Sequence, residues 1–357
     1  MRAQNLNLLT ESLDFSPKGI SELKSNGSTL VAWNFRSHLS ADRSTYSFAT
    51  HDGTEWRGYV LQSPQTRRVI EPETLVIGPD DTVWLTTRNE ILVVDLKANT
   101  AQAFPVSPSL SRSFYVYSAG PHACIARTDG MKSFLLWRQE NTLQKHLLSK
   151  DAILVGANYD KEENCWYVYL SDHRLYRYSP QDQSFSQVAS LPYDTHYVPP
   201  FLYRASADTL YYKLDSDKGS QQDWHTVSLK AVRSHLASHS AIMGIAGDRD
   251  NLFVLLHSYI PNQGAIAYFR GDKLVEVLSS PSWIPGIIHH KGYLCIASNI
   301  QGSITFKDRS DVPRNNGFLL YDPKTQTFAN AFPSKEQFHA PSMAVASKYQ
   351  SMPTLSY

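Results

Sequence analysis

Histidine is the residue type with the most obvious chemical potential in this chain: it occurs 13 times, and six copies fall between His225 and His290. His235 and His239 stand four residues apart, a spacing that on a helix would place both imidazoles on one face, as metal ligands require. Serines precede both histidines and no glutamate follows the first, so the pair is better explained as part of a solvated loop or outer strand. No metal site is predicted from it.

Four carboxylates, Glu71, Glu73, Asp151 and Asp194, fall between apolar runs and could act as general acids or bases. Solvated turns are the more ordinary explanation for them. The sequence contains no GxSxG, HExxH, GxGxxG or phosphate-binding loop motif, which are the patterns that place a nucleophile, a zinc ion or a nucleotide. No catalytic residue and no cofactor is therefore predicted.

Aromatic residues and histidines gather with prolines in several segments that join the apolar runs, most clearly at 191–199 and 280–285. Aromatic rings are costly to expose, so a group of them in surface loops indicates a contact surface. Neighbouring prolines keep such loops stiff, which reduces the entropy lost on binding. Packing over the ends of the core is the alternative explanation. The candidate ligand-binding residues are Tyr115, Tyr193, His196, Tyr197, Trp283 and His339.

The elements that must position these residues repeat along the chain. A short apolar run, a turn of Gly, Asn, Asp or Lys, and a second apolar run recur, for example in Leu75–Trp84, Ile242–Phe253 and Ile287–Leu294. The turns are centred at residues 27, 81, 122, 164, 208, 251 and 292, and five of the six steps between them are 41 to 44 residues long. A period of this length is typical of propeller repeats.

A second hairpin follows each of the first, most clearly at Leu175–Phe185 and Phe318–Phe328, where aromatic flanks surround a central Asp or Pro; a shorter copy is read at Thr226–Val232. Two hairpins per repeat give four antiparallel strands, a sheet that cannot bury its own apolar faces and must stack on its neighbours. The sequence therefore predicts an all-β fold: a single seven-bladed β-propeller domain over residues 1–357, with four antiparallel strands per blade and blades from about 20 to 332.

The chain resembles the seven-bladed propellers of the kelch, NHL and quinoprotein-like repeat groups, chiefly through the strand–turn–strand signature Tyr321–Phe328. It departs from the WD type, because no repeat ends in a Trp-Asp dipeptide preceded by a Gly-His pair, and it lacks the paired glycines of kelch repeats. The resemblance implies the architecture and says little about activity, because propellers host many unrelated functions.

Composition limits the classes of partner. A chain with 42% apolar and 12% aromatic residues is not disordered as a whole. The formal net charge of +1 gives no electrostatic signature of nucleic-acid binding, no apolar run approaches the length of a membrane span, and residues 1–15 lack a signal-peptide pattern. Cys124, Cys165 and Cys295 lie in apolar segments and are expected to be buried thiols in a reducing compartment. We expect a cytoplasmic protein without nucleic-acid or membrane partners.

Three classes of function remain open, one of them an assembly or scaffold subunit with interfaces formed by some of the 20 tyrosines and 7 tryptophans. The first is a recognition module that binds a protein or small-molecule ligand through the aromatic and histidine-containing loops of one face. The alternative is an enzyme of the lactonase, lyase or cyclase type, with its site at the mouth of the central channel. In that case His289 or His290 would need partners from other blades, such as His122 or Asn158. A stoichiometric metal ion would favour the enzyme.

The two ends of the chain must join for the ring to close. Ser342–Ser347 resembles the predicted inner strand Ile242–Gly247, so this tail is expected to pair near the N-terminal blade. A loosely attached tail is the alternative.

Overall fold

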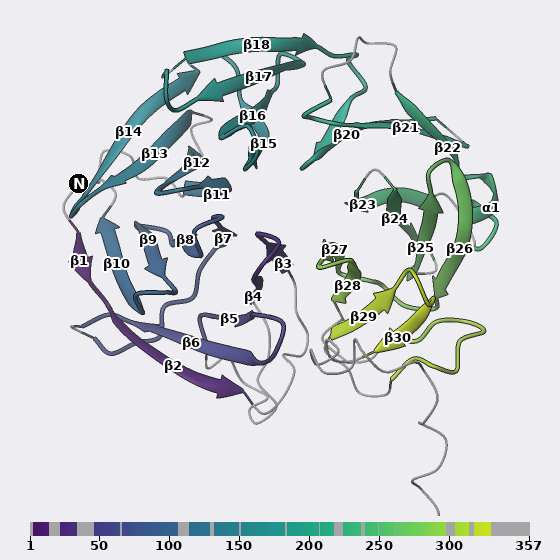
Figure 1. Cartoon of the computed structure of the whole chain (residues 1–357), viewed down its shortest axis with the longest axis horizontal. Helices are drawn as coiled ribbons and strands as arrows, with labels where there is room; N and C mark the ends of the chain where they lie inside the picture. The colour runs from purple at the N-terminus through teal and green to yellow at the C-terminus, as the bar shows by residue number, and fades with distance from the viewer. Residues whose placement is uncertain are drawn as a thin grey trace, which may run out of the picture.

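The computed structural model describes residues 3–13, 22–33, 46–64, 66–105, 114–128, 132–149, 151–182, 184–206, 208–217, 224–236, 240–248, 250–260, 262–297, 304–313 and 318–329. Its strands form seven antiparallel sheets arranged in a ring (Figure 1). Each sheet contains four strands that are consecutive in the chain, and two of the sheets carry a fifth. The predicted all-β, seven-bladed propeller with four strands per blade is confirmed.

Each blade starts at the ring axis and runs outward (Figure 1). Blades 1 to 3 comprise β3 (Glu22–Ser25), β4 (Leu30–Trp33), β5 (Phe48–His51) and β6 (Trp56–Gln62); β7 (Thr74–Ile77), β8 (Thr82–Thr86), β9 (Glu90–Asp95) and β10 (Thr100–Pro105); and β11 (Phe114–Gly120), β12 (Ala123–Thr128), β13 (Ser133–Gln139) and β14 (Thr142–Ser149). Two further strands, β1 (Gln4–Asn5) and β2 (Asn7–Leu13), precede blade 1 in the chain.

The remaining four blades follow the same plan. Blades 4 to 7 comprise β15 (Leu154–Asp160), β16 (Cys165–Leu170), β17 (Arg174–Ser179) and β18 (Ser184–Ser190); β19 (His196–Val198), β20 (Phe201–Ala205), β21 (Thr209–Leu214) and β22 (His225–Ser228); β23 (Ser240–Gly247), β24 (Asn251–Tyr259), β25 (Asn262–Arg270) and β26 (Lys273–Ser280); and β27 (Gly286–His290), β28 (Tyr293–Ala297), β29 (Phe318–Asp322) and β30 (Thr327–Ala329).

The core is divided among the interfaces between adjacent blades. Seven clusters of buried apolar side chains each join two neighbouring blades, including blade 7 to blade 1. Successive residues of a strand point to opposite faces, so in β8 Val83 and Leu85 pack toward blade 1 while Trp84 packs toward blade 3. Because both faces of a blade are covered, its middle strands are rich in apolar residues, and all five residues of β8 are buried. The three cysteines are free and buried, as predicted.

The repeated turn recognised in the sequence joins the first strand of most blades to the second. Asp81, His122, Asn164 and Lys291 adopt φ values of 62°, 56°, 48° and 51° in these turns, and Gly27 has φ 89°. Positive φ is open to glycine and less costly for Asn and Asp than for most other residues. This requirement explains why Gly, Asn and Asp mark the repeat.

Blade 5 departs from the predicted register. Its first strand, β19, has only three residues, and the turn to β20 is formed by Pro199 and Pro200, joined by a cis peptide bond. The turn at residue 208, which the period assigned to the first two strands, joins β20 to β21 instead. The segment 226–232, expected to be a hairpin, is β22 followed by the short helix α1 (Lys230–Arg233). The turn at Pro199 and Pro200 contains no Gly, Asn or Asp, so the turn pattern used to find the repeat did not identify it.

The N-terminal segment forms a belt around the outside of blades 1 to 3 (Figure 1). The backbone N–H of Ala3 donates to the carbonyl of Asn141 in blade 3. β1 then pairs with β10 as a fifth strand of blade 2, and β2 pairs with β6 as a fifth strand of blade 1. Leu6 and Leu8 pack against the cluster between these two blades. The belt therefore covers two sheet edges that would otherwise be open.

The seam between blades 7 and 1 closes by packing of their faces. Its cluster contains Trp56 from blade 1 and Cys295 from blade 7, together with small and aliphatic side chains. At one end, Ser25 Oγ and His290 Nδ1 share a hydrogen bond of 2.7 Å. Lys291 Nζ also donates to the carbonyl oxygen of Asp52 at 2.5 Å. The expected pairing of residues 342–347 lies outside the described residues.

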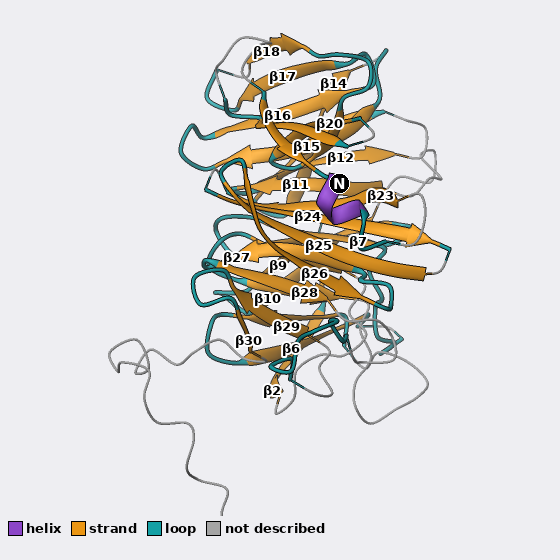
Figure 2. Ribbon diagram, turned by 90° about the vertical axis from the view of Figure 1, so that its right-hand side faces the viewer, coloured by secondary structure: helices purple, strands orange, loops and turns teal. Residues whose placement is uncertain are grey.

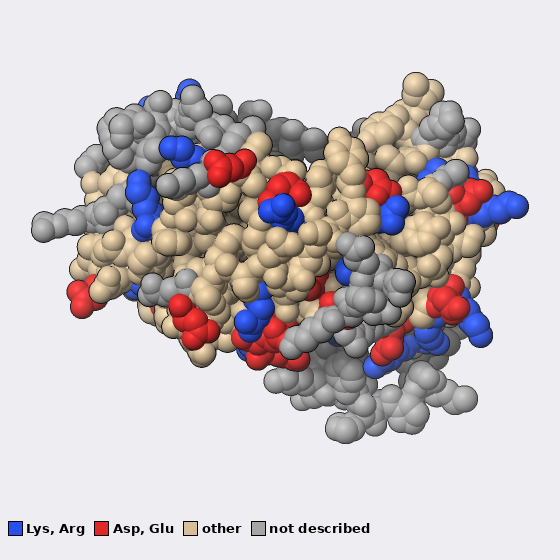
Figure 3. All heavy atoms as spheres, turned by 90° about the horizontal axis from the view of Figure 1, so that it is seen from above, with Lys and Arg blue, Asp and Glu red and all other residues tan. Residues whose placement is uncertain are grey.

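The antiparallel order gives the disk two faces, seen edge-on in Figure 2. The turn face carries the connections between first and second strands and between third and fourth strands. The loop face carries the connections between second and third strands and between successive blades. Charges of both signs are interspersed on the side shown in Figure 3. Within the described residues, no helix is long and apolar enough to cross a membrane.

Candidate functional site

The loop face of blade 6 carries three exposed apolar side chains beside a partly buried tryptophan. The hairpin β24–β25 has two strands of nine residues each, the longest in the described structure. At its tip Tyr259 is 58% exposed and Ile260 is 80% exposed, and beside it Met243 is 43% exposed. Trp283 lies next to them in the segment that leads to blade 7. We call Met243, Tyr259, Ile260 and Trp283 the blade 6 cluster.

Contacts within the blade 6 cluster hold its side chains side by side. Tyr259 donates a hydroxyl hydrogen bond to Met243 Sδ at 3.4 Å, and its ring centroid lies 5.9 Å from that of Trp283. Met243 is the extra residue of a β-bulge, because the pairing of β23 with β24 shifts between Ile242 and Gly244. A bulge re-aims a side chain that a regular strand would pack against its neighbour.

A buried histidine supports the indole from below. His257 is fully buried, and its ring centroid lies 3.6 Å from the Trp283 ring. Burial lowers the pKa of His257 to about 4, so the imidazole is neutral at pH 7. The imidazole that packs against Trp283 is therefore uncharged.

Three predicted contact residues lie toward the loop face and are at least partly exposed. Tyr193 is 86% exposed in the loop between blades 4 and 5, with its ring 4.7 Å from that of His173. His196 begins β19 and stacks on Tyr203 at 5.1 Å. Trp283 belongs to the blade 6 cluster. The structure does not gather Tyr193 and Trp283 in one contact, because they lie on loops of different blades.

The other three predicted residues have different positions. Tyr115, expected in a loop, is the second residue of β11 and half-buried. Tyr197 is only 8% exposed: its hydroxyl donates to Asp215, and its ring meets that of Tyr169 edge-on at 5.8 Å. Tyr197 was predicted as a contact residue in a surface loop, but its ring fills the interface between blades 4 and 5. His339 lies outside the described residues.

The packing role of Tyr197 can be tested at Gly156, which faces its ring. A Cβ atom at Gly156 would lie 2.5 Å from Tyr197 Cδ1, too close for any real contact. We expect Gly156→Ala to lower the free energy of unfolding by roughly 2 to 3 kcal/mol in urea denaturation, because a buried ring must shift. Gly286→Ala is the matched control, since its Cβ would meet nothing within 4 Å. Equal stability of the two variants would contradict this role.

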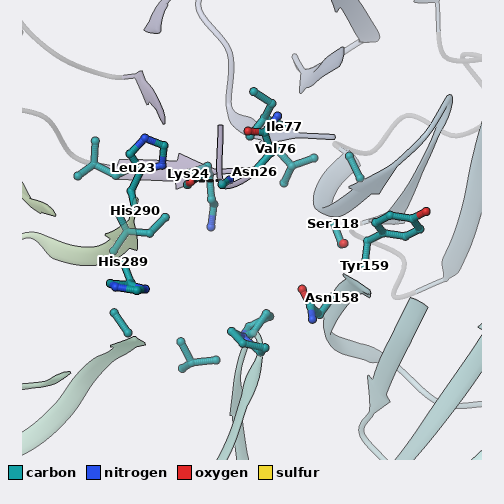
Figure 4. A pocket seen from close by; sticks show the side chains of 18 of the residues that line it. Leu23, Lys24, Asn26, Val76, Ile77, Ser118, Asn158, Tyr159, His289 and His290 are labelled. Atoms are coloured by element: carbon teal, nitrogen blue, oxygen red, sulfur yellow. Dashed lines mark hydrogen bonds between the residues drawn. The ribbon is translucent and has the colours of Figure 1, made fainter. Parts of the chain in front are cut away.

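A cavity of about 490 Å³ opens along the ring axis and is lined by residues of all seven blades. We call it the axial cavity. It lies toward the turn face, since its lining includes the turn residues Gly27, Pro199 and Lys291. Figure 4 shows Lys24, Ser118, Asn158 and His289 around it, each from a different blade. Sequence reasoning named His289 and Asn158 and missed Lys24 and Ser118.

The enzymatic alternative requires carboxylates beside the channel histidines. None of the described residues that line the axial cavity is Asp or Glu. Within the described ranges, no group of three or more His, Cys, Asp and Glu side chains is placed to hold a metal ion. His122 does not reach the channel: it lines a separate hollow of about 330 Å³ between blades 3 and 4, and its Nδ1 lies 3.5 Å from Asp80. One carboxylate lies beside the lining of the axial cavity: Asp248 is 3.9 Å from His289 Nε2, so the described residues offer a single histidine–carboxylate pair there.

Comparison with known proteins adds support for the fold. No protein-family model matches the chain, and no curated protein sequence does. Among solved structures, a prolyl endopeptidase matches with a TM-score of 0.57 and 9% identity, over 88% of this chain and 50% of that one. The β-propeller domain of Cps50 (Swd1) from Myceliophteria thermophila matches at 0.49 and 11% over 85% and 100%. The RRP9 WD40 repeats match at 0.44 and 10% over 85% and 96%.

These matches concern architecture alone, because every identity is far below the level at which function is shared. This chain spans about half the length of the endopeptidase chain that it matches. None of the matches assigns it to one of the repeat groups that its hairpin signature resembles.

Proposed function

We propose that this propeller is a protein-recognition module that holds a polypeptide partner on the blade 6 cluster. The observation that carries the proposal is the exposure of Met243, Tyr259 and Ile260 beside the partly buried Trp283, with Tyr259 in contact with both Met243 and Trp283. Scattered apolar side chains are normal on a protein surface, whereas a contiguous group suggests a binding site.

The blade 6 cluster consists of residue types that contribute much of the binding energy in protein interfaces. Binding energy in protein interfaces concentrates in a few aromatic and large apolar side chains at the centre of the contact, inside a polar rim. Uncharged polar residues flank the cluster here, namely Ser240, Asn262 and Ser282. The cluster stands on a four-stranded sheet, and the neutral His257 packs against the indole, so little order must be gained on binding. The expected partner presents an apolar side chain to Ile260 and Trp283.

The experiment compares capture of partners by the full chain and by variants of the cluster, using cells that produce the protein. Ile260→Asp places a charge at the centre of the contact, and Trp283→Ala removes the indole. We expect each to lower recovery of the bound protein at least about ten-fold, since removing a central anchor costs 2 kcal/mol or more.

The matched control is Val188→Asp. Val188 is 45% exposed on the outer strand of blade 4, so it receives the same change at a surface position remote from the cluster. It should leave recovery unchanged, and all three variants should remain folded and unfold cooperatively in urea. Recovery of the same proteins in the same amounts with Ile260→Asp would contradict the proposed function.

A further inference from the structure

The axial cavity has a charge composition unlike that of the whole chain. The sequence is balanced, with 34 Lys and Arg against 33 Asp and Glu. The described residues that line the cavity include three lysines, Lys24, Lys161 and Lys291, and two histidines, but no Asp or Glu. A concave site lined by charge of one sign concentrates ligands of the opposite sign.

Of the three lysines that line the axial cavity, Lys24 is the best placed to bind a ligand. It belongs to the inner strand β3 and points into the cavity in Figure 4. It forms no ion pair within 4 Å among the described residues. Glu22, a carboxylate that interacts electrostatically with Lys24, lies two residues away on β3 and does not line the cavity. By contrast, Lys291 already donates to the Asp52 carbonyl.

Three neutral donors surround the same space from other blades. Ser118 supplies a hydroxyl, and Asn158 an amide whose Nδ2 also donates to Asp215 at 3.5 Å. His289 Nε2 is buried with no hydrogen-bond partner among the described atoms, 3.9 Å from the Asp248 carboxylate. Each of these groups, like the Lys24 ammonium, can donate to a carboxylate, sulfonate or phosphate group.

The rest of the wall is apolar. Side chains of Val76, Ile77, Ile245 and Ile287 line the cavity between the polar groups. Small-molecule sites commonly combine apolar walls with a few placed polar groups that fix the orientation of the ligand. We propose that the axial cavity binds a small organic anion, with its charged group on Lys24 and its apolar body against the isoleucines. This site is separate from the blade 6 cluster and does not depend on it.

The test uses a matched pair of fluorescent probes with the full chain. Anilinonaphthalene sulfonate is an organic anion with an aromatic body, and phenylnaphthylamine carries the same rings without the charge. We expect the anionic probe to bind one site per chain, more tightly than the neutral probe. Lys24→Gln should weaken the anionic probe at least about ten-fold, because it removes a charge-assisted hydrogen bond, and should leave the neutral probe unchanged.

Three controls keep the result specific. Lys273→Gln removes an exposed lysine of β26 outside the cavity and should leave both probes unchanged. Ile260→Asp should retain the cavity site, so this proposal and the proposed function can fail separately. Displacement of the probe by inorganic phosphate alone would overturn the role of the apolar wall. Equal affinity of the two probes, no stoichiometric site for the anion, or wild-type affinity in Lys24→Gln with intact unfolding would overturn the proposal.

Discussion

Deletion of residues 1–13 is expected to lower the free energy of unfolding by about 3 to 5 kcal/mol. The deletion removes seven residue pairs between β2 and β6 and two between β1 and β10. It also uncovers the apolar cluster against which Leu6 and Leu8 pack, and each partly buried leucine contributes roughly 1 kcal/mol. Two sheet edges become open to pairing with other chains, so the truncated protein should also aggregate more readily. Urea denaturation and light scattering measure the two effects.

A point substitution separates the belt from chain length. Leu8 faces the cluster between blades 1 and 2, whereas Leu9, its neighbour on the other side of the strand, is exposed. Leu8→Ala should cost roughly 1 to 2 kcal/mol and Leu9→Ala less than about 0.5 kcal/mol. An unchanged unfolding midpoint in the deletion would mean that the ring is stable without its belt.

Asp215→Asn is expected to stabilise the protein above neutral pH. Asp215 is buried directly after β21, where it accepts hydrogen bonds from the Tyr197 hydroxyl and, at 3.5 Å, from Asn158 Nδ2. Burial raises the pKa of Asp215 to about 7 in spite of these hydrogen bonds. The folded chain therefore keeps a proton that the unfolded chain releases near pH 4.

The sign of the pH dependence follows from this difference. Between about pH 4 and 7 the unfolded chain binds fewer protons, so the contribution of Asp215 to stability falls as pH rises and then stays constant. Asparagine keeps a hydrogen-bond acceptor without the charge, so the variant should gain roughly 2 to 4 kcal/mol over wild type at pH 8 and little at pH 4. Denaturation across pH 4 to 8 tests it, with the exposed Asp272→Asn as control. A difference that does not grow with pH would contradict the assignment.

The sequence predicts the blade plan because two physical requirements leave marks on it. Turns with positive φ select Gly, Asn and Asp, as at Gly27 and Asn164. Strands covered on both faces are rich in apolar residues, as at Val83, Trp84 and Leu85 of β8. The prediction failed where a turn uses other residues. In blade 5 the first turn is formed by Pro199 and Pro200, so the predicted strand assignment of this blade was wrong. The belt was also missed, because β2 is mostly exposed and lacks an apolar alternation.

The sequence predicted contact residues in loops of one face of the disk. Of the blade 6 cluster it named only Trp283. Trp283 stood out as an aromatic residue among prolines in an interblade segment. Tyr197 stood out in the same way, yet its partner Asp215 is 18 residues distant in the chain, and no local pattern reveals that contact. Met243 reaches the surface through a β-bulge, which periodicity does not show. Lys24 could have been found by asking which inner-strand residues alternate toward the axis.

Site-specific photo-crosslinking tests the central claim, that a protein partner docks on the blade 6 cluster, most directly. A photoreactive amino acid would replace Ile260 in the full chain and, in a separate sample, Val188 on blade 4. We expect irradiation in the producing cells to join one defined protein to position 260 and not to position 188, and expect the product to disappear when Trp283→Ala is added. Crosslinks of equal yield from both positions, or none from position 260, would contradict the account.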